Sequence, residues 1–433
     1  PREIASEICE SVQLDGLCQK IEIAGPGFIN LTIDDDWLKN GLTAALVNER
    51  LGVTQVSEPK TFVIDYSSPN VAKPMHVGHV RSTFIGDAIS KVLRFVGHTA
   101  ISDNHLGDWG TQFGMIIYGY KHFLEEGAYQ QEPVAELGRL YKYVRKLMDY
   151  HAAVKRLPEL EAAQEELKSK QADLESTDSE GDKKAEKQLK KQLRQLRSKI
   201  EDQAQAVVEL KAKISEVDSD AGLARDASAH PNITLNAQLE TAALHEGDAT
   251  NQGLWEKFLP LCREDMQKIY DRLDIEFDYE LGESFYHNEL ANVVSDLTDK
   301  GYTKESDGAI CVFLDNHNAP MIVKKRDGAY LYSTTDLATI KYRMEKWNAD
   351  ACLYVVDHRQ SEHFEKLFDV ARLWGFGEVE LAHVAFGTVM GPDGKPYKTR
   401  SGDTVGLSGL LDEAESRALE IATNQNPELS EDR

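Results

Sequence analysis

Cysteine is scarce in this sequence, and the residues are odd in number and widely separated: Cys9, Cys18, Cys262, Cys311 and Cys352. No C-x-x-C pair occurs, which argues against a disulfide framework and against a structural zinc site. We therefore interpret the five cysteines as reduced thiols in a protein core, and we expect a cytoplasmic protein.

Long hydrophobic runs are also absent. No stretch of about 18 consecutive apolar residues occurs, so we expect no membrane span. The chain starts at Pro1 and continues directly into folded-looking sequence without a signal peptide. We expect it to be a fragment of a longer protein.

Positive charge is in deficit, because 49 Lys and Arg residues stand against 73 Asp and Glu residues and give a formal net charge of −24. Such a surface repels phosphate backbones at long range, so a nucleic-acid partner has to dock on a local basic patch. The length of 433 residues predicts two or three domains, and an apolar fraction of 41% is sufficient for their cores.

What the sequence does contain is an alternation of strand and helix patterns. Residues 61–67, TFVIDYS, are a short apolar run typical of a buried strand. Apolar residues recur at helical spacing from His79 to Val96, and residues 99–105, TAISDNH, again indicate a strand. This order predicts a βαβ unit in a parallel sheet, with ligands bound at the carboxyl ends of the strands.

A second alternation follows late in the chain. We expect a helix at residues 253–273, a hairpin at 309–325, a strand running into a helix at 329–347, a strand at 351–357, a helix at 361–376 and a strand at 381–390. The sequence thus predicts an α/β fold with a Rossmann-like, doubly wound parallel sheet that a helical insertion splits in two.

The insertion contains two arms with apolar residues at spacings of three and four. Leu160, Leu167 and Leu174 mark the first arm, Leu189 to Ile214 the second, and the polar segment STDSEGDKK lies between them. This pattern predicts an antiparallel coiled-coil hairpin at about residues 157–215. Because Lys and Arg residues are balanced by Asp and Glu in this segment, we interpret its charged residues as a solvated face and the hairpin as a spacer. A docking arm for RNA or a protein is the alternative.

The first candidate site is His76-Val77-Gly78-His79, between the first strand and its helix. Gly78 allows a ligand to approach the backbone, and the start of the helix presents N–H groups to an anion. Two imidazoles can donate hydrogen bonds to phosphate oxygens as negative charge builds up. The motif therefore indicates a nucleotide-phosphate site.

The second candidate site is the segment MGPDGKPYKTRSGDTV, residues 390–405, which places Lys395, Lys398 and Arg400 among three glycines. A glycine-hinged basic loop can clamp a triphosphate and stabilise the leaving pyrophosphate. An ordinary exposed basic loop is the alternative.

Six motifs, in this order and at these separations, resemble the arginyl-tRNA synthetase family of class I aminoacyl-tRNA synthetases: SSPNVAKPMHVGHVRST, DNHLGDWGTQFG, LGESFY, GAYLYSTTDLA, DHRQSEH and GKPYKTRSGDTV. The resemblance covers about residues 22–422 and leaves out the hairpin. It implies a monomer that activates L-arginine with ATP and transfers it through arginyl-adenylate to tRNA(Arg). Mg²⁺ should accompany the triphosphate, with no metal held by the protein alone.

The resemblance also implies a division of the chain. The expected segments are the end of a truncated N-terminal domain (1–35), a polar connector (36–60), the two halves of the catalytic domain (61–150 and 327–395), the helical insertion (151–250), connecting helices with a hairpin (251–326), and the basic loop with the start of a C-terminal helical region (396–433). Because the family's anticodon-binding domain is missing, we expect this chain to charge tRNA poorly.

For ATP, the resemblance implies that His76 and His79 bind the phosphates and stabilise the transition state of adenylation. Gly78, Gly387 and Val389 are implied as further contacts to the nucleotide.

The family's second signature, KMSKS, corresponds here to YKTRS at residues 397–401, where Thr399 replaces the second lysine. Members with such a loop have a lysine just before the histidine signature instead. We therefore predict Lys73, Lys398 and Arg400 as the phosphate clamp.

For arginine, carboxylates are the natural partners, because a guanidinium has five donors in a planar fork and no acceptor. The resemblance implies Asp65 and Asp336 for the guanidinium and Tyr332 for the wall of the pocket. Asn70 and Gln360 are implied for the polar backbone end of the amino acid.

Four other motif residues are expected to pack around the site rather than to touch substrate: Trp109, Phe113, Glu283 and Tyr286.

Two other classes of function stay open. One is a simpler nucleotidyltransferase of the H-x-G-H type, which needs no guanidinium pocket. The other is a non-enzymatic scaffold that acts through the hairpin.

Overall fold

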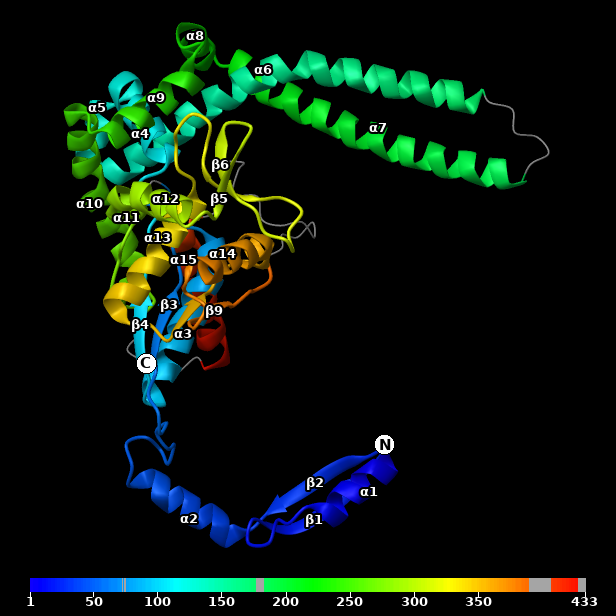
Figure 1. Ribbon diagram of the computed structural model, residues 1–433, viewed down its shortest axis with the longest axis vertical. Coiled ribbons are helices and arrows are strands. Elements are labelled where there is room, and N and C mark those ends of the chain that lie inside the picture. The colour runs from blue at the N-terminus through cyan, green and yellow to red at the C-terminus, as the bar shows by residue number, and fades with distance from the viewer. Residues whose placement is uncertain (72, 74, 177–182, 389–405, 427–433) are drawn as a thin grey trace.

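A computed structural model describes residues 1–71, 73, 75–176, 183–388 and 406–426 of the chain (Figure 1). Its central sheet has four parallel strands in the order β4-β3-β8-β9. The strands are β3 (Thr61–Asp65), β4 (Thr99–Asp103), β8 (Ala351–Tyr354) and β9 (Glu380–His383). Strands from both ends of the sequence are thus hydrogen-bonded neighbours, which confirms the predicted parallel sheet.

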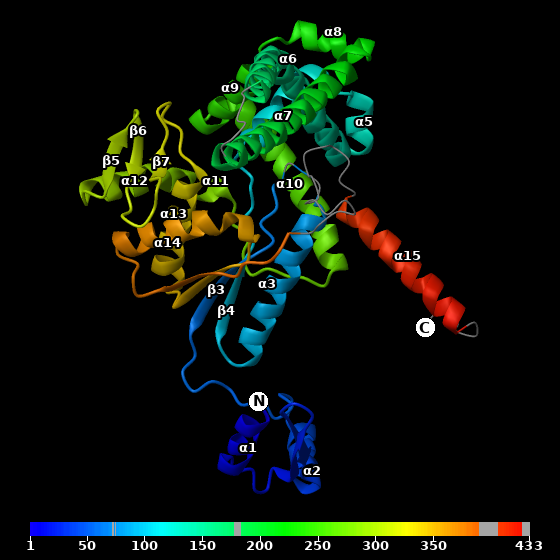
Figure 2. The same ribbon diagram turned by 90° about the vertical axis from the view of Figure 1, so that its right-hand side faces the viewer.

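Helices cover both faces of this sheet (Figure 2). Successive residues of a strand point to opposite faces, and here Val63 and Ile64 are both fully buried. Val63 packs in one core with α13 (Tyr332–Trp347) and α14 (Ser361–Trp374), whereas Ile64 packs in a second core with α3 (Val77–Phe95). Burial on both faces explains why the strand is a continuous apolar run rather than an alternating one.

A smaller antiparallel sheet consists of β5 (Thr303–Ser306), β6 (Ala309–Val312) and β7 (Met321–Lys324), so the predicted hairpin is confirmed. The strand predicted just before α13 is wrong, because Tyr330 makes only one isolated bridge and the helix begins at Tyr332. The hydroxyls of Ser333 and Thr334 donate to carbonyls of β7. These bonds hold the first turn of α13 against the end of β7.

A helical region lies between the two halves of the central sheet. It contains α4 (Thr111–Phe123), α5 (Glu126–Gln131), α6 (Pro133–Glu175), α7 (Lys183–Asp218), α8 (Ala221–Ala229), α9 (Ile233–Glu246), α10 (Ala249–Arg272), α11 (Glu283–Tyr286), a 3-10 turn at His287–Glu289 and α12 (Leu290–Asp299). Helix α10 confirms the amphipathic helix expected at residues 253–273.

Helices α6 and α7 run antiparallel and project from the body (Figure 1). Their inner ends are anchored by buried Val144, Leu147 and Val217. Farther out, Lys211 pairs with Glu161 across the two helices at 2.7 Å. We call α6 from residue 155 onward, together with α7, the helical arm.

The N-terminal part contains α1 (Arg2–Ser11), β1 (Cys18–Ala24), β2 (Phe28–Ile33) and α2 (Asp35–Leu46). The segment expected to be a connector therefore begins with a helix, which Asp34 caps by accepting hydrogen bonds from the N–H groups of Asp36 and Trp37.

The prediction of core thiols is wrong for Cys9 and Cys18, which are only partly buried. Cys262, Cys311 and Cys352 are buried, as predicted.

The last described helix is α15 (Leu407–Gln425). Buried Leu407 donates its N–H to the carbonyl of Met75 at 2.9 Å, so the start of α15 is fixed beside the histidine motif. Among the described residues, no helix is both long enough and apolar enough to cross a bilayer.

Candidate functional site

The histidine motif closes on itself at the start of α3. His76 is the N-cap, and its Nδ1 accepts the N–H of Gly78 at 3.1 Å, while the N–H of His76 donates to Nδ1 of His79 at 3.1 Å. The two imidazole rings stack with their centroids 4.0 Å apart. A Cβ on Gly78 would lie 2.8 Å from Cε1 of His76, so glycine is required here by the close approach of the His76 ring.

Both imidazoles are neutral at neutral pH. Burial, with His76 and Lys73 nearby, lowers the pKa of His79 to about 3, and burial together with Lys73 also lowers the pKa of His76. Since each Nδ1 accepts a backbone N–H, the proton of each neutral ring lies on Nε2. Each ring can therefore donate one hydrogen bond to a phosphate oxygen.

Lys73 lies beside the two histidines, as its effect on their pKa values shows. Its ammonium group sits over the ring of Tyr141 from α6, 5.1 Å from the centroid. The predicted partners Lys398 and Arg400, and also Val389, lie outside the described residues.

The flanks of the basic loop are nevertheless placed next to the histidine motif. The carbonyl of Gly387, a predicted ATP contact, accepts a hydrogen bond from Arg81 of α3. On the other side of the loop, Gly406 forms an isolated bridge with His76. Gly387 and Gly406, which flank residues 389–405 in the sequence, therefore both contact residues near the start of α3.

Tyr332 and Asp336 lie in the first turns of α13 and meet His363 in the first turn of α14. Nε2 of His363 is 2.7 Å from Oδ2 of Asp336, and the rings of Tyr332 and His363 are 4.7 Å apart. Exposed Gln360 immediately precedes α14. Sequence reasoning missed His363, although it is the last residue of the quoted motif DHRQSEH and three residues from Gln360.

Glu283 adds a second carboxyl group near Asp336. Burial raises the pKa of Glu283, His105 opposes this, and the neighbouring carboxylates of Asp108 and Asp336 raise it further. Asp108 itself is fixed, because it accepts from both the N–H and the hydroxyl of Ser284. Glu283 thus lies within electrostatic range of Asp336, and we interpret the two carboxyl groups as suited to a cation, whereas the sequence had suggested only packing for Glu283.

Asp65 has partners inside the protein. Its Oδ2 accepts from Arg343 at 2.6 Å, and its Oδ1 accepts from the hydroxyl of Ser68 at 2.9 Å. The same nitrogen of fully buried Arg343 also donates to Asp103. Burial alone would lower the pKa of Arg343, but the charges of Asp65 and Asp103 raise it well above its usual value, so the guanidinium stays charged.

Asn70 lies where the first two loops of the sheet meet. It forms an isolated parallel bridge with Gly107, and the N–H of the next residue, Val71, donates to the Gly107 carbonyl at 3.1 Å. A Cβ on Gly107 would lie 3.1 Å from Nδ2 of Asn70. The HLGDWG motif therefore supports the Asn70 side chain from one side.

Trp109, Phe113 and Tyr286 have the packing roles that were expected of them. Phe113 and Tyr286 are buried, and Trp109 is partly buried, donating from its indole to Nδ1 of His287 at 3.0 Å. The backbone of Trp109 also forms a hydrogen bond with the carboxyl group of Glu283.

Comparison with known proteins identifies the family. Residues 41–220 and 224–433 match the family described as tRNA synthetases class I (R), catalytic domain. The chain belongs to this family. The first matched range runs through residues 157–215, so the match to the arginyl-tRNA synthetases includes the segment that the resemblance was expected to leave out. Residues 1–33 match the arginyl tRNA synthetase N terminal domain.

Curated relatives agree over the whole chain. It is 48% identical over 432 residues to an arginine–tRNA ligase of Rhodopirellula baltica, covering 98% of this chain and 64% of the relative. It is 39% identical over 444 residues to an arginine–tRNA ligase of Alcanivorax borkumensis, covering 100% of this chain and 62% of the relative. The chain thus spans less than two thirds of the length of these relatives.

Solved structures share the fold. The arginyl-tRNA synthetase of Plasmodium falciparum superposes with a TM-score of 0.59 at 24% identity, over 98% of this chain and 59% of that one. The arginyl-tRNA synthetase of Thermus thermophilus gives a TM-score of 0.54 at 18% identity, over 100% and 64%.

Proposed function

We propose that this chain activates L-arginine with ATP, forming arginyl-adenylate, and transfers the arginyl group to the 3′ end of tRNA(Arg). One observation carries the proposal. The histidine pair lies at the start of α3, and Tyr332, Asp336 and His363 lie at the starts of α13 and α14. All three helices pack on the same parallel sheet. Donors for phosphate and a carboxylate for a guanidinium thus belong to one fold.

Activation is a displacement at the α-phosphorus of ATP. A carboxylate oxygen of arginine forms the new P–O bond, the bond to the β-phosphate breaks, and pyrophosphate leaves. His76 and His79 would donate from Nε2 to phosphate oxygens that gain charge, while Lys73, Lys398 and Arg400 would balance the leaving pyrophosphate. Gly78, Gly387 and Val389 remain the proposed contacts to the nucleotide.

Recognition of arginine would rest on charge and on planar geometry. Asp336 is oriented by His363, and Glu283 supplies the second carboxyl group next to it. Tyr332 would wall the pocket, and Asn70 and Gln360 would hold the amino and carboxylate groups. Asp65 stays in the proposed set, with its carboxylate oriented by Arg343.

Mg²⁺ would enter with ATP. Among the described residues, no group of three or more His, Cys, Asp or Glu side chains is placed to hold a metal ion. Phosphate oxygens and water would then supply most of its ligands, as is common for this ion. Its contribution would be to neutralise charge on the triphosphate.

In the second step, the terminal 2′-hydroxyl of tRNA would attack the carbonyl carbon of the arginyl group, its proton would leave the hydroxyl, and AMP would depart.

We propose that the protein is a cytoplasmic monomer. The five cysteines form no disulfide, which is consistent with a reducing compartment. We also propose that the helical arm is a coiled-coil hairpin, supported by leucine and isoleucine residues of intermediate burial along α7.

The substitution Asp336→Asn tests the arginine site. It removes the charge that faces the guanidinium but keeps the shape, so arginine-dependent ATP–pyrophosphate exchange should lose about 2 kcal/mol or more in kcat/KM, roughly 30-fold, with ATP binding retained. Asp369→Asn is the matched control, because Asp369 forms a similar pair with His317 at 2.9 Å outside the site. Unchanged arginine-dependent exchange in Asp336→Asn would contradict the proposed role of Asp336. Exchange that needs no arginine would favour a simpler nucleotidyltransferase.

A further inference from the structure

One face of α7 is basic on an otherwise acidic protein. Between residues 188 and 200 the sequence has no Asp or Glu, although the chain carries a net charge of −24. Five exposed basic side chains lie in this stretch: Lys190, Lys191, Arg194, Arg197 and Lys199. We call these five residues the α7 basic stripe.

The stripe contains few ion pairs. Four lysines elsewhere on the arm pair with carboxylates: Lys168 with Glu165, Lys170 with Glu166, Lys211 with Glu161 and Lys213 with Asp149. Lys155 and Arg156, at the base of the arm, pair with no carboxylate among the described residues. In the stripe, Arg197 pairs with Glu175 of α6. Within the part of the chain that the structure describes, Lys191, Arg194 and Lys199 have no ion-pair partner. The overall balance of charge on the arm therefore hides a local excess of positive charge.

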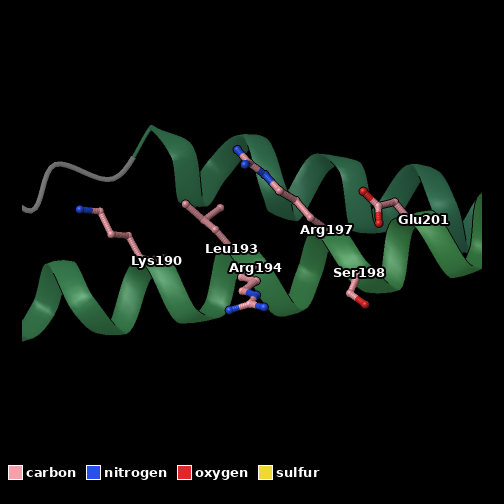
Figure 3. A pocket seen from close by; sticks show the side chains of 6 residues that line it. All are labelled: Lys190, Leu193, Arg194, Arg197, Ser198 and Glu201. Carbon is pink, nitrogen blue, oxygen red and sulfur yellow. The ribbon is translucent and has the colours of Figure 1, made fainter.

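Figure 3 shows three side chains of the stripe, Lys190, Arg194 and Arg197, along α7. Lys190, Arg194, Arg197, Ser198 and Glu201 line a shallow recess of about 550 Å³ together with Leu193. Arg194 and Ser198 point away from α6 in this view, whereas Leu193 and Arg197 point toward it. Residues three and four apart on a helix are about 5–6 Å from each other, so Lys190, Arg194 and Arg197 form a row, with Lys191 beside Arg194. Lys199 lies farther around the helix.

The composition of this row decides which kind of partner it fits. A protein interface of useful affinity centres on buried aromatic or aliphatic anchors, and the exposed residues from 188 to 199 are only Lys, Arg, Gln and Ser. Ammonium, guanidinium, amide and hydroxyl groups are the donors that contact phosphate and sugar oxygens in nucleic-acid complexes. On a protein of net charge −24, RNA can approach only where positive charge is concentrated.

We propose that the α7 basic stripe binds the phosphate backbone of RNA, namely the tRNA that the proposed function requires as its second substrate. The inference rests on that proposed function and adds a docking surface to it. Contacts to phosphate carry no sequence information, so the stripe contributes affinity and orientation rather than the choice of tRNA.

Two triple variants of the 433-residue chain test this. One is Lys191→Gln, Arg194→Gln and Lys199→Gln. The matched control is Lys168→Gln, Lys170→Gln and Lys211→Gln, which removes three positive charges from the same arm where each is paired with a glutamate. Glutamine keeps helix propensity close to that of lysine and arginine, so both variants should fold.

The measurement is fluorescence anisotropy with a labelled tRNA(Arg) transcript at several KCl concentrations. The stripe variant should bind roughly tenfold or more weakly at low salt, and its slope of log affinity against log salt should be shallower by about 2 to 3. A transcript of an unrelated tRNA should lose affinity by a similar factor. The control variant should keep both the affinity and the slope of the unmodified chain.

Equal affinity and slope in the stripe variant and the unmodified chain would overturn the inference, and so would an equal loss in the control variant. Loss of binding to poly-glutamate with full retention of tRNA binding would assign the stripe to an acidic protein and would also overturn it. Calorimetric titration with L-arginine and ATP tests the proposed function separately, because neither ligand needs the stripe. Failure to bind arginine would contradict the proposed function whatever the tRNA result.

Discussion

Arg343 shows how a carboxylate at the end of a strand is oriented from inside the protein. Its guanidinium is fully buried between Asp65 and Asp103, and within the described structure its Nε and Nη1 atoms have no hydrogen-bond partner. An ion pair in such a place fixes the direction of the Asp65 carboxylate, because removing either partner would leave a buried charge uncompensated.

At the same scale, Glu283 predicts a pH dependence of arginine binding. Burial raises the pKa of Glu283, and a bound guanidinium would stabilise its ionised form. At pH values where Glu283 is protonated in the empty site, arginine binding should therefore release a proton. Arginine affinity should therefore rise with pH through the titration of Glu283, by at most about tenfold per pH unit, and level off above it.

Calorimetric titration with arginine in buffers of different ionisation enthalpy measures this proton release directly. Glu283→Gln should bind arginine more weakly with a flat pH dependence, whereas Glu289→Gln, which changes an exposed neighbour, should behave like the unmodified chain. A pH dependence that survives in Glu283→Gln would show that another group titrates on binding.

The sequence predicted the local structure around several candidate residues, and the contacts that it did not predict share a cause. His76, His79, Tyr332 and Asp336 lie within short motifs at the starts of helices, where their positions follow from local structure. The pair of Arg343 with Asp65 joins residues 278 positions apart, so it depends on the order of strands in the sheet and on the face of α13 that is buried. No local pattern contains that information.

At the scale of elements, helix α3 holds the histidine motif by packing tightly on the loop after β3. Gly86 lies under the buried ring of Tyr66, and a Cβ at this position would come within 2.1 Å of Cγ of that ring. The hydroxyl of Ser82, one turn earlier, donates to the carbonyl of Val355 after β8. The same helix thus connects both halves of the sheet to the histidine motif.

Gly86→Ala should therefore destabilise the protein by about 1–3 kcal/mol, because the added methyl group forces Tyr66 or α3 to move. Gly138→Ala in α6 is the matched control, since nothing lies within 4 Å of its Cβ and alanine favours a helix by roughly 1 kcal/mol. Urea unfolding followed by circular dichroism measures both. Equal unfolding midpoints in the two variants would contradict the close packing at Gly86.

Other elements show where local patterns are sufficient and where they are not. Strands β3 and β8 and helices α3, α10 and α14 follow from apolar runs and helical spacing. The strand expected before α13 failed because Ser333 and Thr334 bond to carbonyls of β7, and α2 was missed because its apolar residues Leu38, Leu42 and Leu46 are exposed and line no core. Tertiary contacts thus decide where α13 begins, and the absence of a core beside α2 explains why its helix was not predicted.

At the scale of the whole molecule, one sheet unites two distant segments and a long arm projects from the helical region between them (Figure 1). Charge is distributed at the same scale, with a net acidic chain, carboxyl groups at the proposed arginine site and a basic stripe on α7. This arrangement would guide a cationic amino acid and an anionic RNA to different surfaces.

Activation of arginine by this fold is tested by ATP–pyrophosphate exchange with each of the standard amino acids in the presence of tRNA(Arg). L-arginine alone should support exchange. Lysine lacks the planar fork of a guanidinium, and neutral side chains would leave the carboxyl groups of Asp336 and Glu283 without a cation. Exchange with another amino acid at a comparable rate, or exchange that does not depend on any amino acid, would contradict this expectation.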